Sequence, residues 1–354
     1  GLIILGRESE LTVVDLADRT VTINKPVERV VLGSSRHMHE FVAVEGGENP
    51  FTKIVGWGSD LELYDKDTYN KYVEEFPEIA DIPDVGYHYK GTFSVETVIT
   101  LTPDVVVFPL WIVDYEGIDD DINALETAGI PVIYMDYYTK PFENPVPSTL
   151  LLGYVLNKEE RAREIVDFYT EQTNEVYSRI EEIGEPKPKV YVECGSKGPS
   201  TYGNTYGNTG WGAMITICGG INIAEDLPGG PINPEYLMDK NPDVIVISGS
   251  YWPTTPGSMR LGYFADPEES KEILMAFTER PGWDTISAVE NHRVHSIFHG
   301  FSFRIYNFAG IQSFAKWFYP EEFDDLDPEE RFIEFHERFL PVDYSGVWMM
   351  SIEE

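Results

Sequence analysis

The chain has 354 residues, 42% of them hydrophobic and 13% aromatic, which is enough for about two domain-sized cores and argues against intrinsic disorder. Lys and Arg number 26 against 61 Asp and Glu, and the resulting net charge of −35 argues against nucleic acid or an anionic membrane as the main partner. No apolar run approaches the roughly 20 residues that a membrane-spanning helix needs.

The chain opens with the apolar stretch Gly1-Leu2-Ile3-Ile4-Leu5-Gly6, which is too short for a secretory signal and lacks its basic start. We therefore expect any targeting segment to have been removed. Further along, short apolar runs bounded by turn residues predict strands buried on both faces, as in parallel sheets flanked by helices. In chain order these runs are 29–32, 53–56, 105–109, 131–135, 190–193, 244–248 and 294–298. Helical periodicity lies between them, for example over 119–128, and this alternation is typical of an α/β protein.

One sequence unit occurs in both halves of the chain, over 93–109 and over 232–248. Each copy has a short stretch with apolar residues at helical spacing, then a Pro-Asp turn, then a β-branched run. Each copy therefore predicts a helix, a turn and a buried strand. The repetition indicates two lobes of the same α/β design.

The stretch 157–183 contains neither Gly nor Pro, and its apolar residues recur at helical spacing. It predicts one helix of about 40 Å, a length suited to holding two lobes at a nearly fixed distance. We expect an N-terminal lobe over 1–154, a connecting helix over 155–185, a C-terminal lobe over 186–320, and a tail over 321–354 with a final helix near 329–339.

Candidate ligand-binding residues follow the predicted strands, because ligands of open α/β sheets lie beyond the carboxyl ends of the strands. These loops gather His, basic and aromatic side chains in a chain that is otherwise acidic. The candidates are Arg36, His37, Tyr87, His88, Lys90 and Trp111 in the first half and Lys197, Tyr202, Trp211, Tyr251, Trp252, His299 and Arg304 in the second. The alternative for each is an ordinary loop residue, a solvated side chain or a surface ion pair. As ligand contacts, the rings would supply stacking area and the cations would neutralise charge.

Catalytic motifs are absent from the sequence: it has no Gly-x-Ser-x-Gly, no His-Glu-x-x-His and no phosphate-binding Gly-x-x-x-x-Gly-Lys. Cys194 is either a nucleophile, a buried thiol at a strand end, or bonded to Cys218. Two cysteines form neither a disulfide framework nor a zinc site. We expect His292 and His295, which flank the start of a strand, to be structural and His336, in the last helix, to be solvated.

Several segments together resemble the substrate-binding proteins of ABC importers for iron complexes, haem and cobalamin. The resemblance begins in 13–23 and continues through Lys25-Pro26-Val27-Glu28-Arg29-Val30-Val31. The repeated helix and Pro-Asp unit, the long helix, the segment 219–224 and the tail from 315 to 330 also match. It extends over about residues 11–345, nearly the whole chain.

The resemblance implies two Rossmann-like α/β lobes joined by a single long backbone helix, with a ligand cleft between the lobes. It also implies that the protein is no enzyme, holds no permanently bound cofactor, and works outside the cytoplasm, with a membrane anchor in its precursor. Its expected partner is an ABC importer permease dimer, to which a monomer would dock through one carboxylate on each lobe. The positions that match these carboxylates are Glu96 and Glu235.

The identity of the ligand stays open between several chemistries. A metal complex, whether ferric chelate, haem or corrinoid, would suit the mixture of Arg, His, Tyr and Trp in the candidate loops. Molybdate or tungstate would suit the basic residues through charge-assisted hydrogen bonds, and a bare metal ion would need a His cluster. The alternative of another class is a metal chelatase, in which His88 or His299 would work with a nearby carboxylate.

Overall fold

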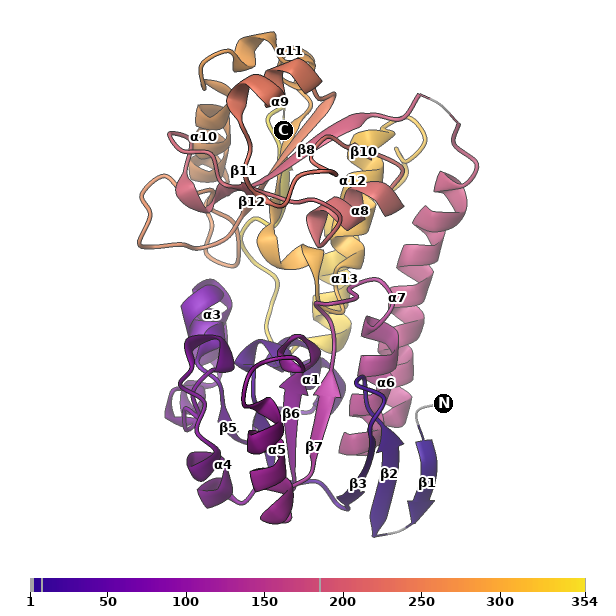
Figure 1. Cartoon of the computed structure of the whole chain (residues 1–354). Coiled ribbons are helices and arrows are strands. Elements are labelled where there is room, and N and C mark those ends of the chain that lie inside the picture. The colour runs from indigo at the N-terminus through magenta and orange to yellow at the C-terminus, as the bar shows by residue number, and fades with distance from the viewer. Residues whose placement is uncertain (1–2, 8, 185, 354) are drawn as a thin grey trace. The chain divides into compact units, whose positions relative to one another are not determined.

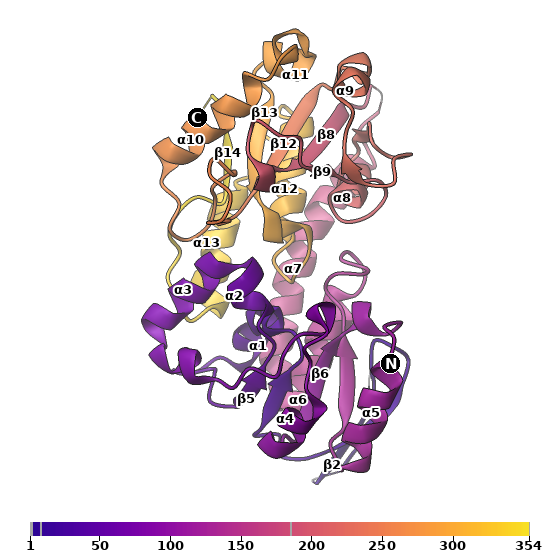
Figure 2. The same cartoon turned by 60° about the vertical axis from the view of Figure 1, so that its left-hand side comes forward.

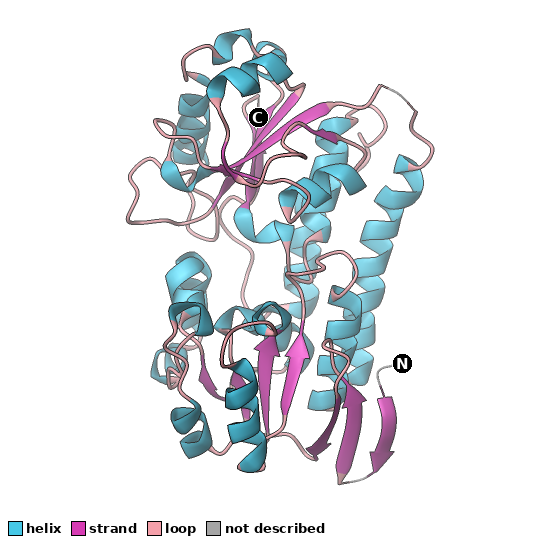
Figure 3. Ribbon diagram, viewed as in Figure 1, coloured by secondary structure: helices cyan, strands magenta, loops and turns pink. Residues whose placement is uncertain are grey.

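The computed structural model describes residues 3–7, 9–184 and 186–353 of the chain (Figure 1). They form two compact units, Gly1–Phe168 with His336–Asp343, and Tyr169–Phe335 with Tyr344–Glu354. The helix predicted over 157–183 is present as α7 (Glu159–Ile180), and the division between the units falls within it. Helices and parallel sheets occur in both units (Figure 3), so the predicted α/β fold class is confirmed. None of the described helices is both long and apolar enough to cross a bilayer.

The first unit is built on a parallel sheet with strand order β5-β4-β6-β7. Its strands are β4 (Val30–Leu32), β5 (Ile54–Trp57), β6 (Val105–Pro109) and β7 (Val132–Met135). All five residues of β6 are buried, as the continuous apolar run predicts for a strand covered on both faces. A separate antiparallel sheet, which the strand predictions missed, consists of β1 (Ile3–Arg7), β2 (Glu10–Val14) and β3 (Thr20–Asn24).

Helices cover the parallel sheet of the first unit (Figure 2). They are α1 (Met38–Glu45), α2 (Asp60–Tyr64), α3 (Lys66–Glu75), α4 (Val95–Leu101), α5 (Ile118–Thr127) and α6 (Pro145–Leu156), with short 3-10 turns η1 (Ser35–His37), η2 (Pro77–Asp81), η3 (His88–Lys90) and η4 (Leu110–Ile112). Helices α4 and α5 contact each other, as do α1 and α6. Val98 of α4 and Leu125 of α5 share one buried cluster with Val106 and Phe108 of β6. Burial of these side chains holds both helices on the sheet.

The second unit contains a five-stranded sheet with strand order β10-β8-β12-β13-β14. The strands are β8 (Lys189–Cys194), β10 (Ile221–Asn222), β12 (Val244–Gly249), β13 (Val294–Phe298) and β14 (Met349–Ser351), and β9 (Asn204–Thr205) pairs separately with β11 (Gly230–Pro231). All pairings of the large sheet are parallel except that of β13 with β14. Its helices are α8 (Trp211–Ile217), α9 (Pro234–Lys240), α10 (Pro267–Thr278), α11 (Ser287–Glu290) and α12 (Phe308–Phe318), with 3-10 turns η5 (Gly195–Lys197), η6 (Trp283–Thr285) and η7 (His299–Ser302). The last helix, α13 (Pro328–Phe339), begins in this unit and ends in the first.

The repeated sequence unit folds in the same way in both units. Helices α4 and α9 each begin at a capping side chain: Ser94 Oγ accepts a hydrogen bond from the Thr97 N–H, and Asn233 Oδ1 accepts from the Glu235 and Tyr236 N–H groups. Each helix ends at a residue in the left-handed region, Thr102 at φ 46° and Asn241 at φ 44°. The Pro-Asp turn and the buried strands β6 and β12 follow.

The two Pro-Asp aspartates have equivalent roles at the start of a neighbouring strand. Asp104 Oδ2 accepts hydrogen bonds of 2.8 Å from the N–H groups of Glu28 and Arg29, and Asp243 Oδ2 accepts one of 2.7 Å from the Lys189 N–H. The cations of those segments return to the helix ends. Arg29 donates to the carbonyls of Leu101 and Thr102, and Lys189 donates to the carbonyl of Lys240. Cations are favoured there because the carbonyls at a helix C-terminus carry partial negative charge.

His295 is structural, as predicted, whereas the prediction of a solvated His336 is wrong. His292, also predicted to be structural, is exposed. The ring of His295 stacks on Trp317 at 4.5 Å, and its Nδ1 lies 2.7 Å from Ser351 Oγ. Burial, together with the nearby Arg293, lowers the pKa of His295 to about 3. His336 is 1% exposed, because the last helix packs this side chain inward.

The variant His295→Gln should weaken the pH dependence of stability below neutral pH. Since the folded-state pKa lies below that of the unfolded chain, stability is present above about pH 6.5 and is lost as the pH falls toward 3. In the wild type, His295 should lower the free energy of unfolding by about 2 kcal/mol between pH 7 and pH 5. Urea unfolding at both pH values measures it. The exposed His292, at φ 56°, is the control: His292→Asn should retain the wild-type loss, and an unchanged loss in His295→Gln would refute the assignment.

Candidate functional site

Arg36 is the central cation of the candidate site in the first unit. It lies in η1, directly beyond the carboxyl end of β4, and its Nε donates a 2.8 Å hydrogen bond to Oδ2 of Asp60. Asp60 is fully buried and also accepts hydrogen bonds from the Ser34 hydroxyl and from the N–H and hydroxyl of Ser35. The other arm of Arg36 donates to the Tyr87 hydroxyl at 3.0 Å. The guanidinium is therefore held from both sides.

The electrostatics of this group keep Arg36 and Asp60 charged. Burial alone would lower the pKa of the Arg36 guanidinium, but the Asp60 carboxylate outweighs that effect and the pKa is raised. Burial alone would raise the pKa of the Asp60 carboxyl, yet Arg36 and the Ser34 hydroxyl lower it overall. Burial raises the pKa of Tyr87. The site thus presents a fixed positive charge beside a neutral phenol.

Aromatic rings surround Arg36. The guanidinium lies 5.4 Å from the Tyr64 ring centroid, and the Tyr87 ring lies 6.3 Å from Tyr64 and 5.8 Å from Trp111. The Lys90 ammonium lies 5.9 Å from the Tyr64 ring and 6.0 Å from that of Tyr89. We call Arg36, Tyr64, Tyr87, Lys90 and Trp111 the Arg36 cluster. It combines aromatic stacking area with two cations.

A groove of about 570 Å³ adjoins the Arg36 cluster and is lined in part by Ser59, Lys90 and Ser94. Gly86, at φ 80°, lies in its wall, and a Cβ at this position would come within 1.9 Å of the Thr92 carbonyl oxygen. Only glycine therefore permits this close approach, which sets the path of the chain toward Tyr87 and Lys90.

The two predicted histidines of the first unit are placed differently from Arg36. His37 is buried, with its ring 6.0 Å from that of Tyr137. His88 stacks on Phe93 at 4.0 Å, and its Nε2 lies 3.3 Å from Oδ2 of Asp121. Burial lowers the pKa of His88, partly offset by Asp121. His88 therefore packs against Phe93 and against Phe108 of β6, lies beside Asp121 of α5, and is not part of the Arg36 cluster.

The predicted residues after β8 do not form one cluster. Lys197 is exposed on η5. The hydroxyl of Tyr202 accepts a 2.9 Å hydrogen bond from the Trp283 indole N–H, and its ring lies 4.3 Å from the Arg280 guanidinium. Trp211 begins α8 and is 1% exposed, stacked on Phe314 at 5.4 Å. In this conformation Trp211 offers no surface to a ligand.

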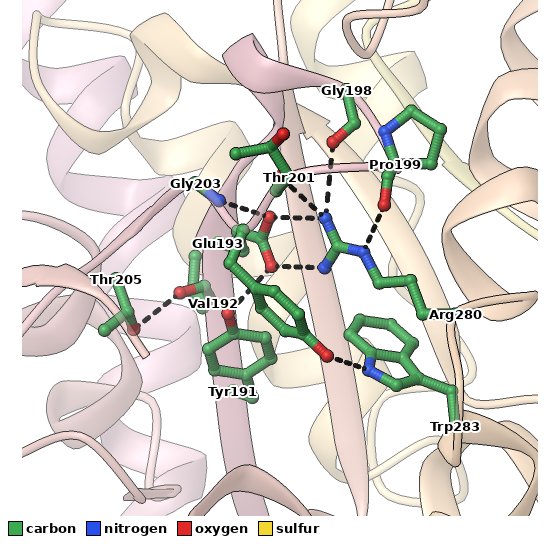
Figure 4. Close-up of polar contacts among 11 residues, drawn as sticks. Tyr191, Val192, Glu193, Gly198, Pro199, Thr201, Gly203, Thr205, Arg280 and Trp283 are labelled. Carbon is green, nitrogen blue, oxygen red and sulfur yellow. Dashed lines mark hydrogen bonds and ion pairs between the residues drawn. The ribbon is translucent and has the colours of Figure 1, made fainter. Parts of the chain in front are cut away.

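A buried ion pair holds the loop that leaves β8 (Figure 4). Nη1 and Nη2 of Arg280 donate to the two carboxylate oxygens of Glu193 at 2.7 and 2.9 Å, and both side chains are almost completely buried. Arg280 also donates to the carbonyls of Gly198, Pro199 and Thr201. This bidentate pairing is the strongest geometry for a charged hydrogen bond.

The Glu193 carboxylate ties the same loop to its own strand. It accepts hydrogen bonds of 2.7 Å from the Tyr191 hydroxyl and from the Gly203 N–H. A Cβ on Gly203 would come within 1.9 Å of the Cys194 carbonyl oxygen, so glycine is needed for this contact. The pair therefore fixes the position of residues 198–203 and, through Arg280, that of Tyr202.

Three more predicted residues lie beyond β12 and β13 in the second unit. Tyr251 and Trp252 are half-buried, and the Arg260 guanidinium lies 4.4 Å from the Tyr251 ring. The His299 ring lies 5.7 Å from that of Trp252, and its Nδ1 is 2.9 Å from Ser248 Oγ. The structure brings Trp252 and His299 together, as their places after neighbouring strands predict.

Arg304 is 4% exposed and has a left-handed backbone at φ 86°. A non-glycine residue in this region costs of the order of 1 kcal/mol or more, which the surrounding contacts must offset. The guanidinium lies 5.2 Å from the Phe303 ring. The alternative of a surface ion pair is therefore wrong for Arg304, because the side chain is buried.

Glu96 and Glu235 occupy the same position in the two copies of the repeat. Each is the second residue of a seven-residue capped helix, α4 or α9, and each is exposed. Helix N-termini favour negative charge, so both carboxylates are stable where they stand without a further partner.

Sequence reasoning missed Asp60, Tyr64, Glu193 and Arg280. Asp60 and Tyr64 follow β5, and the strand-end criterion would have found them had it been applied to the predicted strand at 53–56. Arg280 follows α10 and carries no such signal, because only the fold brings it to Glu193.

Both thiols are free and buried, so Cys194 and Cys218 are not bonded to each other. Within 3–7, 9–184 and 186–353, no group of three or more His, Cys, Asp or Glu side chains is arranged to hold a metal ion.

Comparison with known proteins gives a family match over more than half of the chain: residues 46–297 match the model of a family described as periplasmic binding protein. The crystal structure of the TroA-like periplasmic binding protein FepB from Veillonella parvula is 42% identical. It covers 96% of this chain and 99% of its own, with a TM-score of 0.92.

More distant relatives share the fold. The molybdate-binding protein MolA from Haemophilus influenzae is 21% identical over 94% of this chain and 91% of its own length. Its molybdate-bound structure has a TM-score of 0.69 at 18% identity and covers 95% of this chain and 99% of that one. A periplasmic heme-binding protein from Pseudomonas aeruginosa is 19% identical with a TM-score of 0.56, covering 84% of this chain and 94% of that one.

Proposed function

The chain belongs to the periplasmic binding protein family, and on that premise we propose that it captures a metal complex and delivers it to an ABC importer. The membership confirms the resemblance drawn from the sequence. The family consists of extracytoplasmic solute-binding proteins and not of enzymes. Within the proposal, the transported ligand is a ferric chelate, haem or a corrinoid, no cofactor is permanently bound, and the protein acts as a monomer with a membrane anchor in its precursor.

The Arg36 cluster is the observation that carries the proposal. A guanidinium held by a buried carboxylate is preorganised, so it binds an anionic group without first losing side-chain freedom. The rings of Tyr64, Tyr87 and Trp111 add a stacking surface that suits an organic or macrocyclic ligand. Ordinary oxyanions need hydrogen-bond donors and charge and gain nothing from such a surface.

We propose the second-unit candidates as ligand contacts of the same kind, with Tyr251, Trp252 and His299 as the main contributors. Lys197 and Arg304 are proposed as cations for an anionic ligand, and His37, His88, Tyr202 and Trp211 as residues that support the contacting side chains, since they are engaged in packing or hydrogen bonds. For docking to the permease dimer we propose Glu96 and Glu235.

Molybdate or tungstate is the second candidate. The molybdate-binding relative and the two cations of the Arg36 cluster favour it. Isothermal titration calorimetry against ferric siderophores, haem, cobalamin, molybdate, tungstate and ferric ion separates the candidates. If the protein binds only the oxyanions, molybdate or tungstate becomes the ligand and the metal-complex proposal is wrong. If a separate assay shows repeated metal insertion into a porphyrin, the protein is a chelatase and both binding proposals are wrong.

The variant Arg36→Lys should weaken ligand binding at least about tenfold, or about 1.4 kcal/mol. Lysine retains the positive charge opposite Asp60 but lacks the planar fork that reaches Asp60 and Tyr87 together. The measurement is the dissociation constant for whichever ligand of the panel binds.

Arg19 supplies the matched control for this substitution. It pairs with Asp15 and Glu126, its side chain is 30% exposed against 25% for Arg36, and it donates to the carbonyl of Val132 at the start of β7, away from the strand-end loops. Arg19→Lys should leave affinity unchanged. Equal affinities of the Arg36→Lys protein and the wild type would remove Arg36 from the ligand site.

A further inference from the structure

Cys194, Ser248 and His299 lie together at the carboxyl ends of three adjacent strands of the second unit. Cys194 ends β8, and its register partner on β12 is Ser248. His299 follows Phe298, the last residue of β13, whose register partner on β12 is Gly249. The Ser248 hydroxyl lies 2.9 Å from Nδ1 of His299 and fixes the orientation of the imidazole. The proposed function uses His299 but gives no role to the thiol.

The surroundings of Cys194 stabilise the thiolate. Burial alone would raise the pKa of the thiol, but the His299 imidazole and the hydroxyl and N–H of Ser196 outweigh it and lower the pKa to about 6. Two other charged groups lie close to Cys194 in the sequence. The Glu193 carboxylate is paired with Arg280, and Lys197 on η5 is exposed to solvent. After burial, the charge of His299 is the largest influence on the pKa of this thiol.

Cys218 provides an internal contrast with the same chemistry. It is completely buried, whereas Cys194 is 9% exposed. Its thiol lies 3.5 Å from the Ile311 carbonyl oxygen, and burial raises its pKa. A buried thiol without a neighbouring cation is inert, and a thiol beside an imidazole and N–H donors is the environment of reactive cysteines.

We propose that Cys194 is a nucleophilic thiolate, paired with His299, and a site of reversible modification by small disulfides and related sulfur electrophiles. In the exchange the Cys194 sulfur attacks one sulfur of the disulfide. A new S–S bond forms to Cys194, the old S–S bond breaks, and the second sulfur leaves as a thiolate. No other oxidant is required, because the disulfide is itself reduced. The added group would lie beside His299 and Trp252. Since these are proposed ligand contacts, modification would interfere with ligand binding, an effect that rests on the proposed function.

Methyl methanethiosulfonate is a small probe of this chemistry, and its labelling of the full chain can be followed by mass spectrometry. Attack by the thiolate forms a methyl disulfide on Cys194 and releases methanesulfinate, and dithiothreitol should restore the free thiol. We expect one rapidly labelled residue, lost in Cys194→Ser and retained in Cys218→Ser. Rapid labelling of Cys194→Ser, or equal rates at both cysteines, would overturn the proposal, and the result does not depend on the identity of the ligand.

The variant His299→Gln separates a reactive pair from a merely accessible thiol. At pH 5 it should be labelled about tenfold more slowly than the wild type, because the thiolate fraction falls further than the intrinsic nucleophilicity rises. At pH 9 the difference in labelling rate should vanish or reverse, since Cys194 is then largely ionised in both the variant and the wild type. Ser248→Ala, which retains the imidazole but frees it, should have an intermediate rate at pH 5. Wild-type rates at pH 5 in both variants would refute the role of His299.

Discussion

Replacement of Arg280 by Met should lower the free energy of unfolding by about 3–5 kcal/mol, since it leaves the Glu193 carboxylate buried without its counter-charge. The same substitution removes the three hydrogen bonds that hold the carbonyls of Gly198, Pro199 and Thr201. Met fills much of the space of the arginine stem, so the loss reports mainly on charge and hydrogen bonding. Urea unfolding followed by circular dichroism measures it.

Two comparisons keep this prediction specific to the buried pair. Glu62→Gln, at the exposed Lys66–Glu62 pair, should change stability by less than about 0.5 kcal/mol. The double variant Glu193→Leu with Arg280→Met should recover part of the loss, because no unpaired charge then remains buried. A loss in Arg280→Met no larger than that in Glu62→Gln would show that the pair does not hold the loop.

The parallel strands could be predicted because each is a short, continuous apolar run bounded by turn residues. The run at 294–298 coincides with β13, and those at 105–109 and 244–248 coincide with β6 and nearly all of β12. The edge strand β14 has only three residues and exists because it pairs with β13, far away in the sequence. Such a strand has no local signal, so its absence from the predictions follows from its non-local origin.

The candidate site shows the same division between local and non-local information. Arg36 was predictable from its place after a strand, but its partner Asp60 follows a neighbouring strand and only the parallel pairing of β4 with β5 brings them together. Trp211 was predicted to contact a ligand from a loop after a strand, yet α8 begins at this residue and its ring packs onto Phe314. Side-chain direction within a loop is set by packing that the sequence pattern does not contain.

The paired variant Glu96→Lys with Glu235→Lys should abolish uptake of the ligand by whole cells and leave the affinity of the purified protein for that ligand unchanged. Both carboxylates are exposed at the second position of equivalent helices, so a two-fold symmetric partner would contact both in the same way. Reversal turns each proposed attraction toward a permease arginine into a repulsion, which costs several kcal/mol in such interfaces. Uptake of labelled ligand and calorimetry measure the two quantities separately.

Glu268 is the matched control, because it isolates the docking role from the local cost of the substitution. Like Glu235, it is an exposed second residue of a helix that begins with Pro after a capping side chain, here Asp266 in α10. Glu268→Lys therefore carries the same helix-dipole penalty of about 0.3–1 kcal/mol, yet should retain uptake. Each single reversal at Glu96 or Glu235 should reduce uptake by an intermediate amount, since one of two contacts survives. If the paired variant binds its ligand more weakly, or if Glu268→Lys loses uptake equally, the two carboxylates act through the fold or the net charge of the protein and not through docking.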